Sequence, residues 1–183
     1  MLKKRSYISL LILILAHNIA FLGCDDTEDH EVVQDEHVCE HLTDTASVAL
    51  QAVANAQTAI DSLSGDVNYR IQTQDHIRFD LSLIQDSTSL YYGYVPYMPI
   101  DGDGDYILYL DKEAHVELVN VTESTTVAPE EEMDHSDYCD AIHYMGIYEL
   151  HAEDTYLLSF YEIMDPSIGV VFVKVEDHEG HDH

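Results

Sequence analysis

The sequence predicts an all-β domain, an antiparallel β-sandwich of the jelly-roll kind, after an N-terminal signal helix and a disordered acidic tether. Apolar and polar residues alternate with a period of two from Ile77 to Leu83, as in strands with one buried face. Tyr106, Leu108 and Leu110 recur with the same period. Similar segments recur about every 10–14 residues with turn residues between them, which is typical of sandwiches. The chain beyond Cys24 is long enough for one domain with its own core.

The expected strands follow one another along the chain. The alanine-rich stretch from Thr43 to Leu63 fits either a helix or a strand, and we predict a strand in its part 46–54. The stretch from Val127 to Asp137 contains Pro129 and an acidic run, which predicts a loop. Further strands are predicted at 77–83, 91–98, 106–110, 116–121, 144–150, 156–161 and 170–175.

The first 23 residues have the parts of a secretory signal peptide. A basic start precedes an apolar run that is shorter than the roughly 20 residues of a membrane span. The segment Phe21-Leu22-Gly23-Cys24 resembles the bacterial lipobox, in which the cysteine is acylated and becomes the new N-terminus. The resemblance implies a lipid anchor at Cys24 and a place in the cell envelope, facing the periplasm or the exterior. It does not distinguish the inner from the outer membrane.

The expected organisation has four parts, which are a signal peptide at 1–23, a lipid-anchored acidic tether at 24–37, a β-sandwich domain at 38–176 and a His/Asp-rich tail at 177–183.

The charge of the chain is strongly negative. It has 36 Asp and Glu against 7 Lys and Arg, a formal net charge of −29, and all the acidic residues follow Cys24. Such a surface repels nucleic acid and anionic lipid head groups and attracts cations. Solubility alone is a sufficient reason for most of this charge.

Three cysteines are present, and the lipid accounts for Cys24. The remaining pair, Cys39 and Cys139, predicts one disulfide in an oxidising compartment. The bridge would close a loop of about 100 residues and contribute up to roughly 4–5 kcal/mol in the chain-entropy model. The alternative is that both thiols are metal ligands.

Histidine is the residue type that points to chemistry, because imidazole is the commonest ligand of zinc and similar metals. The chain has 12 histidines, of which three lie among acidic residues in the tail: His178, His181 and His183. This composition is typical of metal binding. We expect loose, poorly selective binding of zinc, nickel or copper, with a merely solubilising tail as the alternative.

A second group of histidines flanks the two remaining cysteines, and its members are His37, His41, His135 and His143. Bonded cysteines have Cα atoms about 5–6 Å apart, so a bridge from Cys39 to Cys139 would gather these four imidazoles. The disulfide is then the scaffold of a metal site. The alternative is a disulfide with a purely structural role, surrounded by solvent-exposed histidines.

Other chemical signals are weaker. The acidic turn Asp101–Asp105 suits a hard cation such as calcium, but the sixth and twelfth positions of an EF-hand loop are here Tyr106 and Lys112, which favours a tight acidic turn. The sequence contains no nucleophile elbow, zinc-protease motif or phosphate loop, so no enzymatic activity is expected. Tyrosines at 91, 92, 94 and 97 fit a sugar-binding face or, more simply, packing in the core and at a sheet edge.

Two segments, Gly104–Leu110 and Tyr144–Leu150, are similar to strands of bacterial pre-peptidase C-terminal-like jelly-roll domains. The chain from about residue 36 also resembles uncharacterised bacterial lipoproteins with a Cys-Glu-His segment, here Cys39-Glu40-His41, and a His-rich C-terminus. The resemblance implies a β-sandwich with a non-enzymatic role and supplies no ligand.

The sequence therefore predicts a lipid-anchored protein that binds divalent metal ions, zinc first and then copper or nickel. Its expected role is that of a metal-handling accessory, with a metal transporter or another envelope protein as a possible partner and no nucleic acid. The alternative is a structural or adhesion-type sandwich that binds a protein or glycan.

Overall fold

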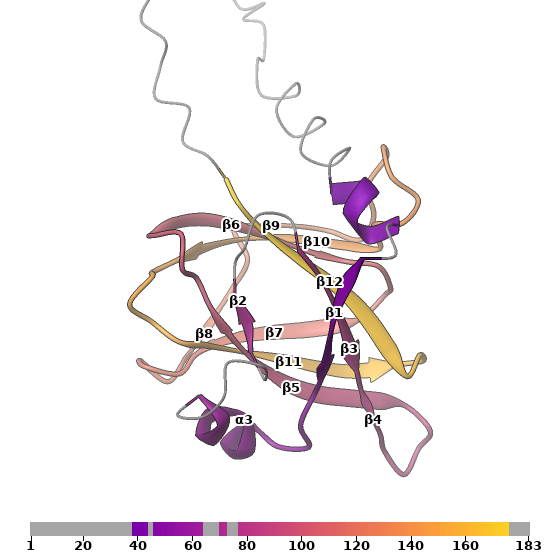
Figure 1. The fold of residues 1–183 in the computed structure, drawn as a ribbon, viewed down its shortest axis with the longest axis horizontal. Helices are drawn as coiled ribbons and strands as arrows, with labels where there is room; N and C mark the ends of the chain where they lie inside the picture. Colours follow the sequence, from indigo (N-terminus) through magenta and orange to yellow (C-terminus); the bar gives the residue numbers. More distant parts are fainter. Residues whose placement is uncertain (1–37, 44–45, 64–69, 73–76, 176–183) are drawn as a thin grey trace, which may run out of the picture. The chain divides into compact units, whose positions relative to one another are not determined.

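The computed structural model describes residues 38–43, 46–63, 70–72 and 77–175. Most of these residues are in strands, and the strands form two sheets that pack together as a sandwich (Figure 1). The predicted all-β class is confirmed. In this part of the chain no helix is long and apolar enough to cross a membrane.

The first sheet, sheet A, contains the strands β1 (Ser47–Gln51), β3 (Arg78–Ser82), β12 (Ser167–Lys174), β6 (Gly104–Leu110), β10 (Tyr144–Leu150) and β9 (Glu131–Met133), in that spatial order. The second, sheet B, contains β2 (Ile71–Gln72), β5 (Tyr91–Met98), β11 (Tyr156–Ile163), β7 (His115–Asn120) and β8 (Thr125–Val127), with β4 (Ile84–Gln85) beside β5. The strand pairs are antiparallel except for β1 with β3 and β2 with β5.

The main core lies between the two sheets, because alternate residues of each strand point inward. Tyr97 of β5 stacks on Phe172 of β12 with ring centroids 3.9 Å apart, and both rings are almost completely buried. This contact joins sheet B to sheet A. The period-two pattern from Ile77 to Leu83 is confirmed as well, since Phe79 and Leu81 of β3 are buried in this core.

The alanine-rich stretch contains both of the structures that its sequence fits. β1 occupies the first part of the predicted strand 46–54, and Val53 then pairs with Tyr94 of sheet B. The helix α3 (Ala56–Ser62) follows, with Asn55 accepting a hydrogen bond from the N–H of Thr58 as its N-cap. The chain therefore passes from sheet A to sheet B before the helix begins.

The predicted loop from Val127 to Asp137 is wrong at Glu131–Met133, which form β9 at the edge of sheet A. All three side chains of β9 are exposed. An acidic run is compatible with an edge strand, because charged side chains there face solvent and discourage pairing with other chains.

A second apolar cluster covers the outer face of sheet A. The central strand β6 is buried at every position from Tyr106 to Leu110, although alternation predicted only one buried face. The outward-facing Ile107 and Tyr109 pack with Val38 and Leu42 of a helical segment at 38–43. Strands covered on both faces lose their alternation and become continuously apolar.

The Cys39–Cys139 disulfide is present, with the two Cα atoms 5.8 Å apart and a sequence separation of 100. It joins the helical segment 38–43 to the loop before β10. Leu42 is also held to sheet A, because its carbonyl oxygen accepts a hydrogen bond from the guanidinium of Arg78.

Candidate functional site

The surroundings of the disulfide are the first candidate site, because the sequence places histidines on both sides of it. Cys139 is buried and Cys39 is partly buried. The loop that carries Cys139 is held by its own backbone, since the N–H of Ile142 donates to the carbonyl oxygen of Cys139 at 3.0 Å. The disulfide therefore joins two segments that are each fixed against the outer face of sheet A.

The structure places three of the predicted metal-binding histidines near these segments. His41 lies half-buried in the helical segment. His135 is exposed, with its Nε2 atom 3.7 Å from Oδ1 of Asp137. His143 is exposed and immediately precedes β10, where its backbone N–H donates to the carbonyl oxygen of Leu110 at 2.9 Å.

These histidines do not form a preformed metal centre. Among the residues that the structure describes, no three His, Cys, Asp or Glu side chains are grouped closely enough to hold one ion. The bridge brings together the segments that carry His41 and His143. The other predicted site residues lie outside the described part of the chain: Cys24, His37, His178, His181 and His183.

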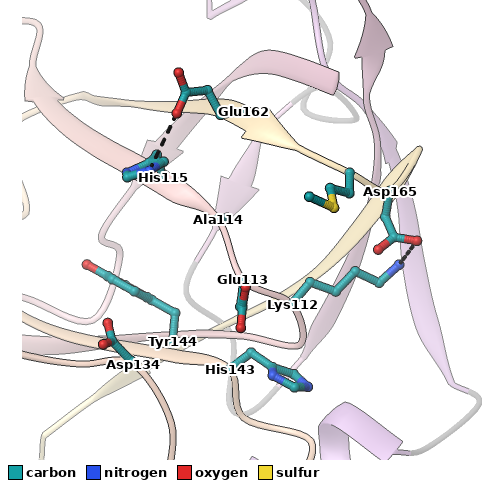
Figure 2. Close-up of a pocket in the computed structure, with 10 residues that line it drawn as sticks. Lys112, Glu113, Ala114, His115, Asp134, His143, Tyr144, Glu162 and Asp165 are labelled. Carbon is teal, nitrogen blue, oxygen red and sulfur yellow. Dashed lines mark ion pairs between the residues drawn. The ribbon is translucent and has the colours of Figure 1, made fainter. Parts of the chain in front are cut away.

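A pocket with a volume of about 650 Å³ adjoins the same loop region (Figure 2). Its walls come from the β6–β7 turn, the loop between β9 and β10, and the end of β11. The lining is polar and mostly charged, and it consists of Lys112, Glu113, Ala114, His115, Asp134, His143, Tyr144, Glu162, Met164 and Asp165. Figure 2 shows His115 and His143 on different walls of this pocket.

Two pairs of side chains are in contact within the pocket, and one of them is a Lys–Asp ion pair. Lys112 Nζ lies 3.3 Å from Oδ1 of Asp165, and His115 Nε2 lies 3.6 Å from Oε2 of Glu162. The ring of His115 also stacks on Tyr161, with centroids 5.6 Å apart. These contacts hold the walls in place, and they leave an acidic, open pocket that suits a cation better than an anion.

Glu162 owes its place in the pocket to an irregularity of β11. The register between β11 and β5 shifts between Phe160 and Ile163, and Glu162 has a φ of 59°. A bulge of this kind re-aims a side chain and often lies beside a functional site. Buried Tyr144 forms the adjoining wall, and burial together with its hydrogen bond to Tyr148 raises the pKa of its phenol, so Tyr144 stays neutral at physiological pH.

Sequence reasoning identified only His143 among the lining residues of the pocket. The other lining residues come from three regions far apart in the chain, at 112–115, 134–144 and 162–165. Neither the spacing nor the composition of these regions indicates that they meet. The acidic run at 130–134, which includes the lining residue Asp134, is the one local sequence feature that points to a charged surface here.

The acidic turn at Asp101–Asp105 is structural, as its sequence favours. Gly102 and Gly104 have positive φ angles of 99° and 137°, which glycine adopts readily. The side chain of Lys174 donates to the carbonyl oxygen of Asp101 at 2.8 Å, and Oδ1 of Asp103 accepts from the N–H of Ala152 at 2.8 Å. The turn is therefore tied to β12 and to the loop after β10 by hydrogen bonds.

The tyrosines at 91, 92 and 94 are each half-buried, and Tyr91 packs against the main core. Tyr97 is completely buried in the same core, so the expectation that it could line a sugar-binding face is wrong.

No protein-family model matches this chain, and the comparison with curated proteins finds no match either. The fold and the site therefore define the class of protein only as a disulfide-linked β-sandwich with an acidic surface.

Proposed function

We propose that this protein is a lipid-anchored, extracytoplasmic protein that binds divalent metal ions, zinc first, as a non-enzymatic accessory in metal handling. The anchor is Cys24, at the end of a segment with the parts of a secretory signal. The excess of acidic residues favours cations. Histidine and carboxylate together suit zinc, and copper or nickel next.

One observation carries the proposal. The Cys39–Cys139 bridge joins two segments that each contain histidines, and the Cα atoms of the two cysteines lie 5.8 Å apart. His41 belongs to one segment and His135 and His143 to the other. A disulfide also implies an oxidising compartment, which agrees with the proposed location outside the cytoplasm.

The described residues supply at most part of a metal site, because no three suitable side chains among them are grouped. Tight zinc binding needs about four ligands in tetrahedral geometry. The additional ligands in this proposal come from His37 and from the three histidines of the tail.

A calorimetric titration with zinc tests the proposal. The oxidised full chain, purified in detergent without a tag, should bind zinc, and a His41→Ala/His143→Ala variant should bind it more weakly. Unchanged affinity in that variant removes the disulfide region from the site. Absence of zinc binding by the unmodified chain contradicts the proposed function, and the adhesion alternative then takes its place.

The lipid anchor has a separate test. In a bacterial host supplied with labelled palmitate, the unmodified chain should incorporate label and fractionate with membranes. A Cys24→Ala variant should incorporate none, whereas a Cys39→Ala/Cys139→Ala variant should be labelled normally. Label in the Cys24→Ala variant contradicts the anchor at this position.

A further inference from the structure

The strand β1 forms one edge of sheet A. Within the described part of the chain it pairs with β3 on one side (Figure 1) and with no strand on the other. Its side chains are exposed at every position except Leu50. An edge strand presents unpaired backbone N–H and C=O groups to solvent, so it offers a template on which another strand can add.

β1 lacks the charges that protect the opposite edge of sheet A. That edge is β9, where Glu131 and Glu132 are exposed. Charged side chains on an edge strand prevent it from pairing with other chains. β1 instead lies within residues 45–60, the longest run after Cys24 that contains no Asp, Glu, Lys or Arg. In a chain with a formal net charge of −29, this uncharged edge is where an equally negative copy meets the least local repulsion.

The two edges of sheet B offer less backbone to a partner. β2 consists of Ile71–Gln72 and β8 of Thr125–Val127, whereas β1 has five residues. Very short edge strands resist the addition of a further strand, because they present few unpaired groups. Among the described edge strands, β1 is therefore the longest and one without any charge.

The side chains of β1 are complementary to those of a second β1 in antiparallel orientation. A two-fold axis at Ala49 places Val48 of one chain opposite Leu50 of the other. Both belong to the face of β1 that points to the main core, and Val48 is 42% exposed. The same axis places Ser47 opposite Gln51. The pairing therefore covers an exposed valine with a leucine, sets polar residues opposite each other and opposes no like charges.

The sequences that flank the domain fit this edge less well than a second β1 does. Residues 25–37 and 176–183 are both rich in Asp and Glu, and acidic residues, Asp above all, are depleted in strands. They would also bring negative charge against the one neutral edge of an acidic domain. A copy of β1 brings an uncharged strand of matching length.

We propose that two copies of this chain associate through β1, in an antiparallel pair centred on Ala49 that joins their two A sheets into one continuous sheet. The interface is isologous, because the same strand serves both chains. Main-chain hydrogen bonds supply the affinity of such a pair, and the alternating side chains supply its register. Each chain contributes one short strand, so the contact is small and the dimer dissociates on dilution. The inference is independent of the proposed metal binding.

Sedimentation velocity of the oxidised full chain, in a density-matched detergent, tests the inference. A chelator is present, so that no metal ion joins two chains. The unmodified chain should pass from monomer to dimer as its concentration rises. Ala49→Lys should weaken dimerisation about tenfold or more, because the two-fold axis sets the two introduced ammonium groups opposite each other.

Met133→Lys is the matched control. Met133 is exposed and lies on β9, at the other edge of sheet A, and its replacement adds the same charge. This variant should dimerise at least as tightly as the unmodified chain, because an added positive charge lowers the overall repulsion between two acidic chains. Ala49→Lys lowers that overall repulsion equally. Weaker dimerisation of Ala49→Lys alone therefore identifies a contact at β1.

Disulfide trapping tests the register of the pair. Residues directly opposite each other in an antiparallel pair have Cα atoms about 4.5–5.5 Å apart, which is within the range of a disulfide. Under mild oxidation, Ala49→Cys should therefore form a covalent dimer that a reductant dissolves. Met133→Cys, at the acidic edge, should form little of it under the same conditions.

Two results overturn the inference. If the unmodified chain stays monomeric up to the highest concentration, β1 does not pair with a second copy. If Ala49→Lys dimerises as tightly as the unmodified chain, the copies associate through another surface. Urea unfolding verifies that Ala49→Lys is folded; if it is not, the trapping experiment decides, and absence of a covalent dimer of Ala49→Cys overturns the inference. None of these results bears on zinc binding, because the chelator removes the metal.

Discussion

Asp111 joins Arg78 to the backbone of Gly169 through its two carboxylate oxygens. Its Oδ2 atom accepts from Nη2 of Arg78 at 2.8 Å, and its Oδ1 atom accepts from the N–H of Gly169 at 2.6 Å. The Arg78 side chain is 17% exposed and that of Asp111 is 14% exposed. Arg78 in turn donates to the carbonyl oxygen of Leu42. One carboxylate therefore connects sheet A with the helical segment that carries Cys39.

Replacing Asp111 with Ala should lower the free energy of unfolding by about 1–3 kcal/mol, because it leaves the Nη2 group of Arg78 and the N–H of Gly169 without their acceptor. Asp80 still pairs with Nε of Arg78 at 2.8 Å, so the charge of the guanidinium remains partly balanced. Asp111→Asn should cost less, since an amide oxygen can still accept from Gly169. Urea unfolding of the two variants measures both effects. A loss below about 0.5 kcal/mol for Asp111→Ala, the range of ordinary surface substitutions, contradicts this role.

The disulfide should stabilise the domain considerably. The Cys39→Ala/Cys139→Ala variant should lose about 2–5 kcal/mol of unfolding free energy, because its unfolded chain is no longer cross-linked over a long loop. Protease cleavage within 38–43 should also become faster, since this segment then loses its covalent link to the loop before β10. A reductant should destabilise the unmodified chain similarly and leave the variant unchanged; equal stability of oxidised and reduced chains contradicts the prediction.

The sequence predicted the elements whose pattern is local. β5 agrees with its prediction at both ends, because a run of β-prone residues ends at Pro99. The disulfide followed from counting cysteines once Cys24 was assigned to a lipid. β6 was predicted as a strand but not as one buried on both faces, because the cover at 38–43 lies far away in sequence and a short helix there has no distinct pattern.

The candidate pocket could not be predicted for a related reason. Lys112 and His143 belong to two different connections and Glu162 to the end of β11, and only the strand order brings them together. Glu162 also depends on a bulge in β11, and a single extra residue in a strand leaves no reliable mark in the sequence. The strand β9 was not predicted because its acidic residues favour a loop. An edge strand nevertheless tolerates charged side chains, since they face solvent.

Stability should fall at alkaline pH through the buried tyrosines. Burial raises the pKa of Tyr106 to about 12 from its ordinary value of 10.0, and burial likewise raises the pKa of Tyr156. A raised pKa means that the folded state resists ionisation. The stabilisation from these phenols is therefore complete below pH 10 and is lost as the pH rises from 10 toward 12.

The predicted loss of stability can be tested by measuring urea unfolding midpoints across this pH range, together with the absorbance of tyrosinate. Tyr106→Phe should reduce the alkaline loss of stability, although it also removes the hydrogen bond to the carbonyl oxygen of Gly102 and so starts from a lower value. Tyr138→Phe is the control, because the side chain of Tyr138 is exposed. If the stability of Tyr106→Phe falls with rising pH as steeply as that of the unmodified chain, the ionisation of Tyr106 does not cause the loss of stability.

Gly93 allows the chain to pass from sheet A to sheet B. A Cβ atom on Gly93 would collide with Cβ of Ala52, and Ala52 lies between β1 and the pairing of Val53 with Tyr94. Gly93→Ala should therefore cost about 1–3 kcal/mol, as overpacking does. Ala52→Gly removes the colliding atom, so the double variant should be more stable than the sum of the two single losses predicts. Urea unfolding of the unmodified chain, the two single variants and the double variant measures the coupling free energy between the two positions. Strictly additive losses of stability would show that the two backbones can move apart and that Gly93 is not needed for their close approach.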